Sequence, residues 1–230
     1  MTVKIIGISG SPYEGGNTDI MVNEALKAAK GTGNVETEFI GLAGKSIHPC
    51  LGHFCKFKTP GGETCRKPNR EELGWCNIKD DMQKFYPKLL EADAWIVGSP
   101  VYMATVSGQL KMFMDRCRPI SGGPKQQYPE EGAKQHGWLR DKVGGAISVG
   151  WARMGNEDMA VRVILEWMLC NTMIIVGIDQ ETIKGYGWIG AMGVTGVKDD
   201  VRLDEPSMEL ARNIGVRVAK VTKMVKKGQE

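Results

Sequence analysis

The first eighteen residues constrain this chain most, because they join an apolar strand directly to a loop suited to an anion. Residues 3–8 are almost entirely apolar, residues 9–18 are rich in glycine and hydroxyl side chains, and apolar residues recur at helical spacing over residues 19–29. This order brings backbone N–H groups and the positive end of a helix together, which predicts a phosphate site. Four side chains of the loop can donate hydrogen bonds to a phosphate: Ser9, Ser11, Asn17 and Thr18.

The spacing within this loop excludes two common nucleotide sites. A dinucleotide fingerprint needs three glycines as G-x-G-x-x-G, and hydroxyl side chains occupy two of those places. A mononucleotide P-loop needs Gly-Lys-Ser or Gly-Lys-Thr at its end, and no lysine follows Gly15 or Gly16. Gly44-Lys45-Ser46 imitates that ending, but Phe39 stands where the first glycine of the motif is required.

Apolar runs and helical periodicities alternate along the rest of the chain. The expected strands cover residues 3–8, 35–42, 94–98, 143–149 and 173–178. The expected helices cover residues 19–29, 80–91, 106–117 and 156–170, and a last one begins near residues 204–206. This alternation predicts an α/β fold with a parallel sheet and helices on both faces. We expect a single domain, residues 1–230, with irregular insertions at 43–78 and 118–140 and a loop over residues 179–200.

Two separate stretches resemble one known family. Residues 9–12 followed by residues 16–18 resemble the flavin-phosphate loop of the flavodoxin-like NADPH-dependent FMN reductases, and residues 98–102 with 108–116 resemble their second flavin loop and the helix after it. The resemblance covers nearly the whole chain. It implies a flavodoxin-like doubly wound sheet of five strands in the order 2-1-3-4-5, FMN as cofactor, NAD(P)H as substrate and a homo-oligomer. In such a sheet the ligand lies where the winding reverses, beyond the carboxyl ends of strands 1 and 3.

Three loops are then expected at the cofactor, because the carboxyl ends of parallel strands share one edge of the sheet. The candidate cofactor-binding residues are Ser9, Ser11, Pro12, Gly16, Asn17 and Thr18 from the first loop, Pro100, Val101, Tyr102 and Met103 from the second, and Ser148, Gly150 and Trp151 from the third. Tyr102 and Trp151 can each stack on a flavin or close the core. The glycine-rich surroundings of Trp151 favour the site. No catalytic side chain is assigned, since hydride enters and leaves the flavin ring itself.

Four of the six cysteines lie within a span of 27 residues: Cys50, Cys55, Cys65 and Cys76. Four thiolates in one irregular loop are a ligand set for a 4Fe-4S cluster or, less favourably, for tetrahedral zinc. The segment resembles the iron–sulfur flavoproteins within the family, but their cysteines are two residues apart, whereas the gaps here are four, nine and ten residues and His53 stands where a cysteine is expected. Two hypotheses stay open, a metal cluster or a cysteine-bearing substrate loop without metal. The other two cysteines, Cys117 and Cys170, fall on apolar helix faces and are expected to be buried thiols.

The net charge and the lengths of the apolar runs indicate which partners and which cellular compartment to expect. Thirty basic and twenty-seven acidic side chains give a net charge of +3, which argues against a nucleic-acid surface. No run of about 18 apolar residues suits a membrane span and the first residues do not suit a signal peptide, so we expect a cytoplasmic protein with reduced cysteines.

The leading hypothesis is an FMN-dependent oxidoreductase that transfers electrons from NAD(P)H to flavin, a quinone-like molecule or another small acceptor. The alternative is an iron–sulfur flavoprotein that passes single electrons between ferredoxin-like partners. The near-neutral charge offers little electrostatic steering for a protein partner, which favours the enzyme. A regulatory nucleotide-binding module without redox chemistry has the least support.

Overall fold

The computed structural model describes residues 1–52, 76, 78–121, 138–179 and 188–229, and its elements follow the expected alternation of strands and helices. They are β1 (Val3–Ser9), α1 (Asn17–Gly31), β2 (Val35–Gly41), α3 (Met82–Glu91), β3 (Ala94–Tyr102), β4 (Thr105–Val106), α4 (Gly108–Arg116), β5 (Val143–Gly150), α5 (Glu157–Cys170), β6 (Ile174–Ile175), β7 (Ala191–Val194) and α6 (Glu205–Lys227), with short 3-10 helices at Arg118–Ile120 and Val201–Leu203.

The main sheet has the strand order β2-β1-β3-β5-β6, and each of these neighbours pairs in parallel. In chain order this is the doubly wound 2-1-3-4-5 arrangement, so the fold expectation is confirmed. The strand count differs, because the sheet has seven strands in the described residues and the sequence predicts five. The two additions are β4, which pairs antiparallel with β3, and β7, which pairs in parallel with β5.

The fifth position of the sheet is divided between two short strands, which corrects the expected strand at 173–178. Only β6 pairs with the start of β5, opposite Val143 and Gly144. Further along the same edge β7 pairs with Ile147 to Gly150, so the expected loop at 179–200 contains a strand. β7 escapes pattern analysis because it has four residues and includes Gly193, whose lack of a side chain lets Met21 and Val201 pack against it.

The strand β3 is longer than expected and includes most of the second predicted loop. Ser99 and Pro100 pair with Ser148 and Val149 of β5. The chain then reverses at Met103 and Ala104, whose φ angles of 46° and 66° are both left-handed, and returns as β4. Two successive left-handed residues are the geometry of a tight hairpin turn. Neither is glycine or asparagine, so the residue types do not reveal the turn.

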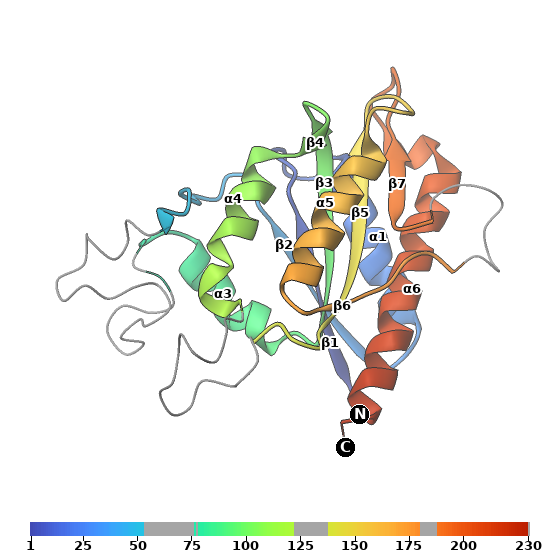
Figure 1. Ribbon diagram of the computed structural model, residues 1–230. Coiled ribbons are helices and arrows are strands. Elements are labelled where there is room, and N and C mark those ends of the chain that lie inside the picture. The colour runs from blue at the N-terminus through green and yellow to red at the C-terminus, as the bar shows by residue number, and fades with distance from the viewer. Residues whose placement is uncertain (53–75, 77, 122–137, 180–187, 230) are drawn as a thin grey trace.

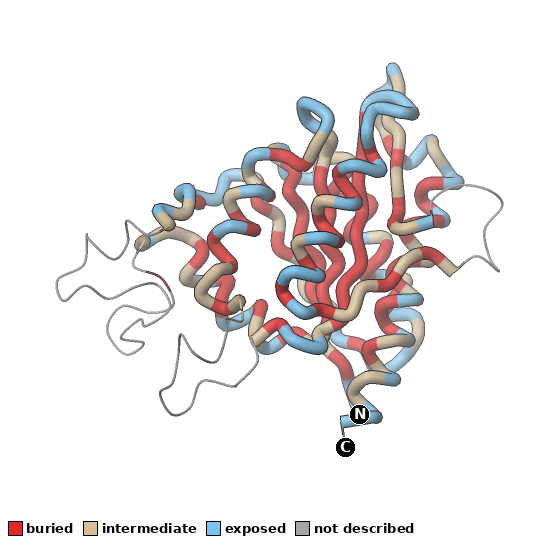
Figure 2. Tube along the Cα trace, in the orientation of Figure 1, coloured by how far each residue is buried: buried red, intermediate tan, exposed pale blue. Residues whose placement is uncertain are grey.

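Helices cover both faces of the sheet (Figure 1), as the alternation predicts. α1 and α6 pack on one face, where Gly98 admits Val22 and Gly145 admits Ile214 and Val218. α3, α4 and α5 cover the other face over a second apolar cluster. Figure 2 shows burial concentrated along the strands and the helix surfaces that meet them. The central strands are apolar on both sides because both of their faces are covered.

Within the described residues, the helices are all too short or too polar to cross a bilayer.

Candidate functional site

A pocket of about 520 Å³ opens at the carboxyl ends of β1, β3 and β5. This volume lies in the range of pockets that hold cofactors. The expected first, second and third loops all contribute to its walls, together with a fourth segment at residues 195–202. Of the thirteen candidate cofactor residues, ten line it: Ser11, Pro12, Gly16, Asn17, Thr18, Pro100, Val101, Tyr102, Gly150 and Trp151.

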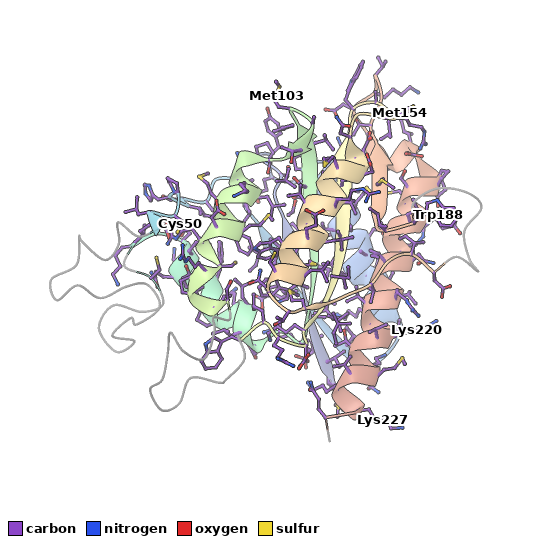
Figure 3. All side chains as sticks on the ribbon, viewed as in Figure 1. Cys50, Met103, Met154, Trp188, Lys220 and Lys227 are labelled. Carbon is purple, nitrogen blue, oxygen red and sulfur yellow. The ribbon has the colours of Figure 1, made fainter. Side chains whose placement is uncertain are left out.

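The other three candidates lie outside the pocket lining. Ser9 is fully buried, and its Oγ accepts a hydrogen bond from the backbone N–H of Ser11 at 3.3 Å. Ser148 is also fully buried and donates to the carbonyl oxygen of Glu157 at 2.8 Å. Met103 is 96% exposed at the tip of the β3–β4 hairpin (Figure 3). Ser9 and Ser148 therefore stabilise the first and third loops through hydrogen bonds to the backbone and do not reach the pocket.

Hydrogen bonds to the Ser11 hydroxyl and to the buried Asp19 carboxylate determine the conformation of the first loop. Ser11 Oγ donates to the carbonyl oxygen of Tyr13 at 2.7 Å and accepts from its N–H at 3.1 Å. Gly15 adopts a left-handed φ of 71° and donates its N–H to Asp19 Oδ2 at 2.9 Å. Ser11 is thus engaged in shaping the loop, and the left-handed turn explains a glycine at position 15.

The start of α1 fits a phosphate group. Gly16 occupies the N-cap and offers no side chain to cap the first turn. A Cβ added at Gly16 would lie 2.7 Å from Ser11 Oγ, so only glycine keeps the cradle in this shape. Uncapped helix N–H groups and the positive helix end favour an anion at this place. The donor chemistry and the shape of the loop therefore both suit the phosphate of FMN.

Asn17 has a different role from the expected phosphate donor. Its Nδ2 donates to Asp199 Oδ1 at 2.9 Å and to Asp199 O at 3.1 Å, and its Oδ1 accepts from the N–H of Val201 at 2.9 Å. The amide thereby connects residues 195–202 to the first loop. This segment adds residues to the pocket that the sequence analysis missed: Thr195, Lys198, Asp199, Asp200 and Arg202. Their only sequence signal is a dense group of charges in a loop.

The second loop presents Tyr102 at the pocket. Its side chain is partly exposed, and burial first, then the charges of Tyr13 and Asp199, raise the pKa of Tyr102 above its usual value. The phenol therefore stays protonated at neutral pH and keeps its hydrogen-bond donor. Ser107 connects this loop to the first loop: its N–H donates to Ser99 Oγ at 2.9 Å and its Oγ donates to the carbonyl oxygen of Gly10 at 2.7 Å.

The third loop places Trp151 on the pocket wall with most of its side chain exposed. Behind it, a Cβ at Gly150 would collide with the carboxylate of Glu157, which is buried at the start of α5. Glu157 Oε1 has no hydrogen-bond partner in the described part of the chain. Arg153 lies in this loop, and its Nη2 pairs with Asp204 Oδ1 at 2.9 Å outside the pocket lining.

Two of the four clustered cysteines lie in the described residues. Cys50 is half-buried, and Cys76 is 3% exposed among the side chains under α3 and α4. Cys55 and Cys65 fall outside the described residues. No three Cys, His, Asp or Glu side chains group as metal ligands within residues 1–52, 76, 78–121, 138–179 and 188–229.

A buried cation lies close to the backbone at Cys76. Arg116 Nη2 lies 3.5 Å from the carbonyl oxygen of Ile78, and Gln83 Nε2 donates to the carbonyl oxygens of both Cys76 and Ile78. Burial alone would lower the pKa of Arg116, but the hydrogen bonds to Asp80 raise it, so the guanidinium stays charged. A permanent cation at this end of the segment fits a negatively charged iron–sulfur cluster.

The remaining two cysteines differ from each other. Cys117 is fully buried, as expected, and burial raises the pKa of its thiol, so it stays protonated and inert. Cys170 is exposed at the last residue of α5, which contradicts the expectation of a buried thiol. The last buried position of that helix is Met168, two residues earlier.

Comparisons with known proteins agree with this fold. The family model described as NADPH-dependent FMN reductase matches residues 3–180. An iron-sulfur flavoprotein of Methanocaldococcus jannaschii is 41% identical over 226 residues, which are 98% of this chain and 100% of that protein. An iron-sulfur flavoprotein of Methanosarcina thermophila is 34% identical over 186 residues, covering 81% of this chain and 83% of that protein. The solved structure of a flavodoxin, WrbA-like protein from Agrobacterium tumefaciens shares the fold with a TM-score of 0.54 at 18% identity, covering 97% of this chain and 99% of that one.

Proposed function

Because the chain belongs to the NADPH-dependent FMN reductase family, on its iron–sulfur flavoprotein branch, we propose that it is an FMN-dependent oxidoreductase that takes hydride from NAD(P)H and reduces free flavin, a quinone-like molecule or another small acceptor. The supporting observation is one pocket that unites residues 11–18, 100–102 and 150–151 at the carboxyl edge of the sheet. When bound there, FMN would supply a ring that accepts hydride and releases electrons.

The amino-terminal loop would hold the phosphate end of the cofactor. Gly16 leaves the first turn of α1 open, and Asp19 keeps Gly15 in its left-handed turn by accepting its N–H. The backbone N–H groups and the helix dipole then provide the attraction for the phosphate. Lys198 on the opposite wall adds a positive charge that can reach the pocket.

The second and third loops would hold the ring. Residues 100–102 offer an apolar edge that ends in the protonated phenol of Tyr102, and Trp151 offers a second aromatic surface from the loop after β5. These groups bind and orient a flat ligand and exclude water from one side of it. No side chain needs to transfer a proton for hydride to arrive, so we assign none as catalytic.

The second candidate function is electron transfer through a cluster held by Cys50, Cys55, Cys65 and Cys76. Its support is the 41% identity to a protein named iron-sulfur flavoprotein and the buried Arg116 guanidinium, which lies 3.5 Å from the Ile78 carbonyl oxygen at the end of the segment that contains these cysteines. A 4Fe-4S cluster would supply single-electron steps, and the partners would be ferredoxin-like proteins. With a net charge of +3, the chain offers only weak electrostatic steering for such partners.

We further propose a cytoplasmic homo-oligomer. Several large apolar side chains are exposed near the pocket mouth, including Tyr13, Trp151 and Met154. Met103 and Met154 stand at the same edge of the molecule (Figure 3). A second copy of the chain covering this edge would remove them from water.

The test is purification without oxygen, followed by an absorbance spectrum, FMN quantification, and iron and sulfide analysis. The enzyme proposal expects flavin bands and oxidation of NADH or NADPH with a quinone as acceptor. A broad additional shoulder with stoichiometric iron and sulfide supports the electron carrier. Protein that stays colourless and takes up no added FMN contradicts both functions.

A further inference from the structure

We call residues 50–76, which contain the four clustered cysteines, the cysteine segment. The chain on both sides of this segment contacts one buried ion pair, between Arg116 and Asp80. Each of the two side chains is 1% exposed, and Arg116 Nη1 lies 2.5 Å from Asp80 Oδ2 while Nη2 lies 3.0 Å from Oδ1. This is a bidentate arrangement, in which two parallel N–H groups meet two carboxylate oxygens. The pair comes from α4 and from the turn before α3, which are 36 residues apart.

The ion pair also bonds to the backbone on both sides of the segment. At its beginning, Arg116 Nη1 donates to the carbonyl oxygen of His48 and Asp80 Oδ2 accepts the N–H of His48, each at 2.9 Å. At its end, Arg116 Nη2 lies 3.5 Å from the carbonyl oxygen of Ile78. Gln83 adds to this end by donating to the carbonyl oxygens of Cys76 and Ile78 at 2.5 and 2.9 Å. The residues before and after the cysteine segment therefore both lie at the Arg116–Asp80 pair.

The helix that carries Arg116 connects this place to the flavin pocket. Its N-cap, Ser107, is bonded to Gly10 of the phosphate loop. From that cap to Arg116 the helix extends about 14 Å at 1.5 Å per residue. Tyr86 secures the far end by donating its hydroxyl to the carbonyl oxygen of Arg116 at 2.6 Å. α4 thus sets the separation between the phosphate loop and the stem of the cysteine segment.

One hydrogen-bond donor of this arrangement is spare. Arg116 Nε is buried and has no partner among the residues that the structure describes. A buried N–H without an acceptor costs free energy, so Nε is available to an acceptor other than the described residues. Of the clustered cysteines in the described residues, Cys76 is linked to this guanidinium through shared contacts: it is 3% exposed, and Gln83 bonds both to its carbonyl oxygen and to the Ile78 carbonyl oxygen that Arg116 Nη2 approaches at 3.5 Å.

We propose that Arg116, held in place by Asp80, is the positioning residue of the cysteine segment. It brings the two ends of the segment together, holds Cys76 in place through the shared contacts at Ile78, and offers its spare Nε–H to the sulfur of a metal-bound Cys76. The first two parts stand on the contacts of this chain alone. The third part rests on the proposed cluster.

The positioning role is tested on the full chain, loaded with FMN and kept free of iron by a chelator. Alkylation by iodoacetamide is followed at each cysteine by mass spectrometry, with exposed Cys170 and buried Cys117 as internal references. We expect Arg116→Gln to raise the alkylation rate of Cys76 at least about tenfold while Cys117 stays protected. Lys111→Gln, which breaks the exposed Lys111–Asp115 pair on the same helix, should leave Cys76 protected.

A second variant keeps this test decisive. If Arg116→Gln exposes Cys117 as well, the fold has opened, and the double variant Asp80→Asn with Arg116→Gln replaces it because no unpaired buried charge is left. It still lacks the guanidinium that bonds both ends of the segment. Unchanged protection of Cys76 in either variant, with Cys117 protected, overturns the positioning role.

The spare donor is tested after anaerobic addition of iron and sulfide, by iron content and by the midpoint potential of the cluster. We expect Arg116→Gln to lose iron to a chelator about tenfold more readily. In variant protein that carries full iron, loss of the cation should disfavour the reduced cluster about tenfold, a shift of 59 mV to lower potential for one electron, and Arg116→Lys should recover most of it. An unchanged potential in fully loaded Arg116→Gln overturns this part. If the wild-type chain takes up no iron, the cluster hypothesis itself fails, and the alkylation result alone decides the positioning role.

Discussion

Asn17 and Asp199 are 182 residues apart in the sequence, yet the side-chain amide of Asn17 donates to the Asp199 carboxylate at 2.9 Å. This contact joins the first turn of α1 to the segment after β7. It makes residues 195–202 a wall of the proposed FMN pocket, and it places a carboxylate next to the loop proposed to hold a phosphate. The amide of Asn17 therefore separates two negative groups as well as connecting two segments.

We predict that Asn17→Asp weakens FMN binding by at least about tenfold, because the variant loses its donors to Asp199 and sets two carboxylates against each other. Fluorescence titration with FMN measures the effect. The swap Asn17→Asp with Asp199→Asn restores one donor and one carboxylate in reversed positions, and it should recover most of the affinity if the link between the segments is what matters. No recovery in the swapped variant would show that a carboxylate at position 17 repels the phosphate directly.

We predict that Gly16→Ala raises the dissociation constant for FMN by about tenfold or more. The new methyl group would lie 2.7 Å from Ser11 Oγ and 3.1 Å from the carbonyl oxygen of Tyr13, so the cradle must change shape. Gly108→Ala is the matched control, since an added Cβ at the start of α4 meets nothing within 4 Å. The prediction is wrong if both alanine variants bind FMN as the wild type does.

We predict that Arg116→Gln lowers the free energy of unfolding by about 3–5 kcal/mol, because Asp80 is left as an uncompensated buried charge. Adding Asp80→Asn should recover part of this loss. Lys111→Gln, which removes an exposed pair, should cost no more than about 1 kcal/mol. Urea unfolding followed by circular dichroism measures all three, and equal losses for Arg116→Gln and Lys111→Gln would contradict the burial argument.

We predict a pH dependence that traces to Asp80. Burial alone would raise the pKa of Asp80, but the hydrogen bonds from Arg116 and from the backbone of His48 bring it below its usual value of 3.8. A carboxylate with a depressed pKa in the folded state stabilises the protein above its unfolded pKa, and that contribution is lost as the pH falls below about 3.8. The difference in stability between wild type and Asp80→Asn should therefore narrow on acidification, as measured by urea unfolding from pH 7 to pH 3. A difference that stays constant over this range would contradict it.

The fold was predictable because its evidence is local. The apolar run of residues 3–8 and the helical spacing after it appear as β1 and α1 within two residues of the expected bounds. The strand order agrees with the family resemblance. The division of the fifth strand was missed because β6 and β7 have two and four residues, too few for a period to show.

The candidate site was predictable in its location and less so in its contacts. Ten of thirteen candidate residues line the pocket, since parallel strands deliver their following loops to one edge. The roles of Ser11 and Asn17 differ from simple phosphate donors, because their hydrogen bonds go to Tyr13 and to residues 199–201. A side chain's hydrogen-bond capacity can be read from its type, but its partner depends on what the fold brings near.

The sequence by itself determined the α/β alternation, the glycine- and hydroxyl-rich loop at residues 9–18 and the grouping of four cysteines, because hydrophobic period, turn chemistry and residue spacing act over short stretches of chain. Only the tertiary structure decided that β7 would carry residues 195–202 to the pocket, that Asn17 would bond to Asp199, and that Arg116 and Asp80 would meet under full burial at the stem of the cysteine segment. Those contacts join residues 36 to 182 positions apart, and their geometry follows from sheet register and helix packing, which a local pattern does not contain.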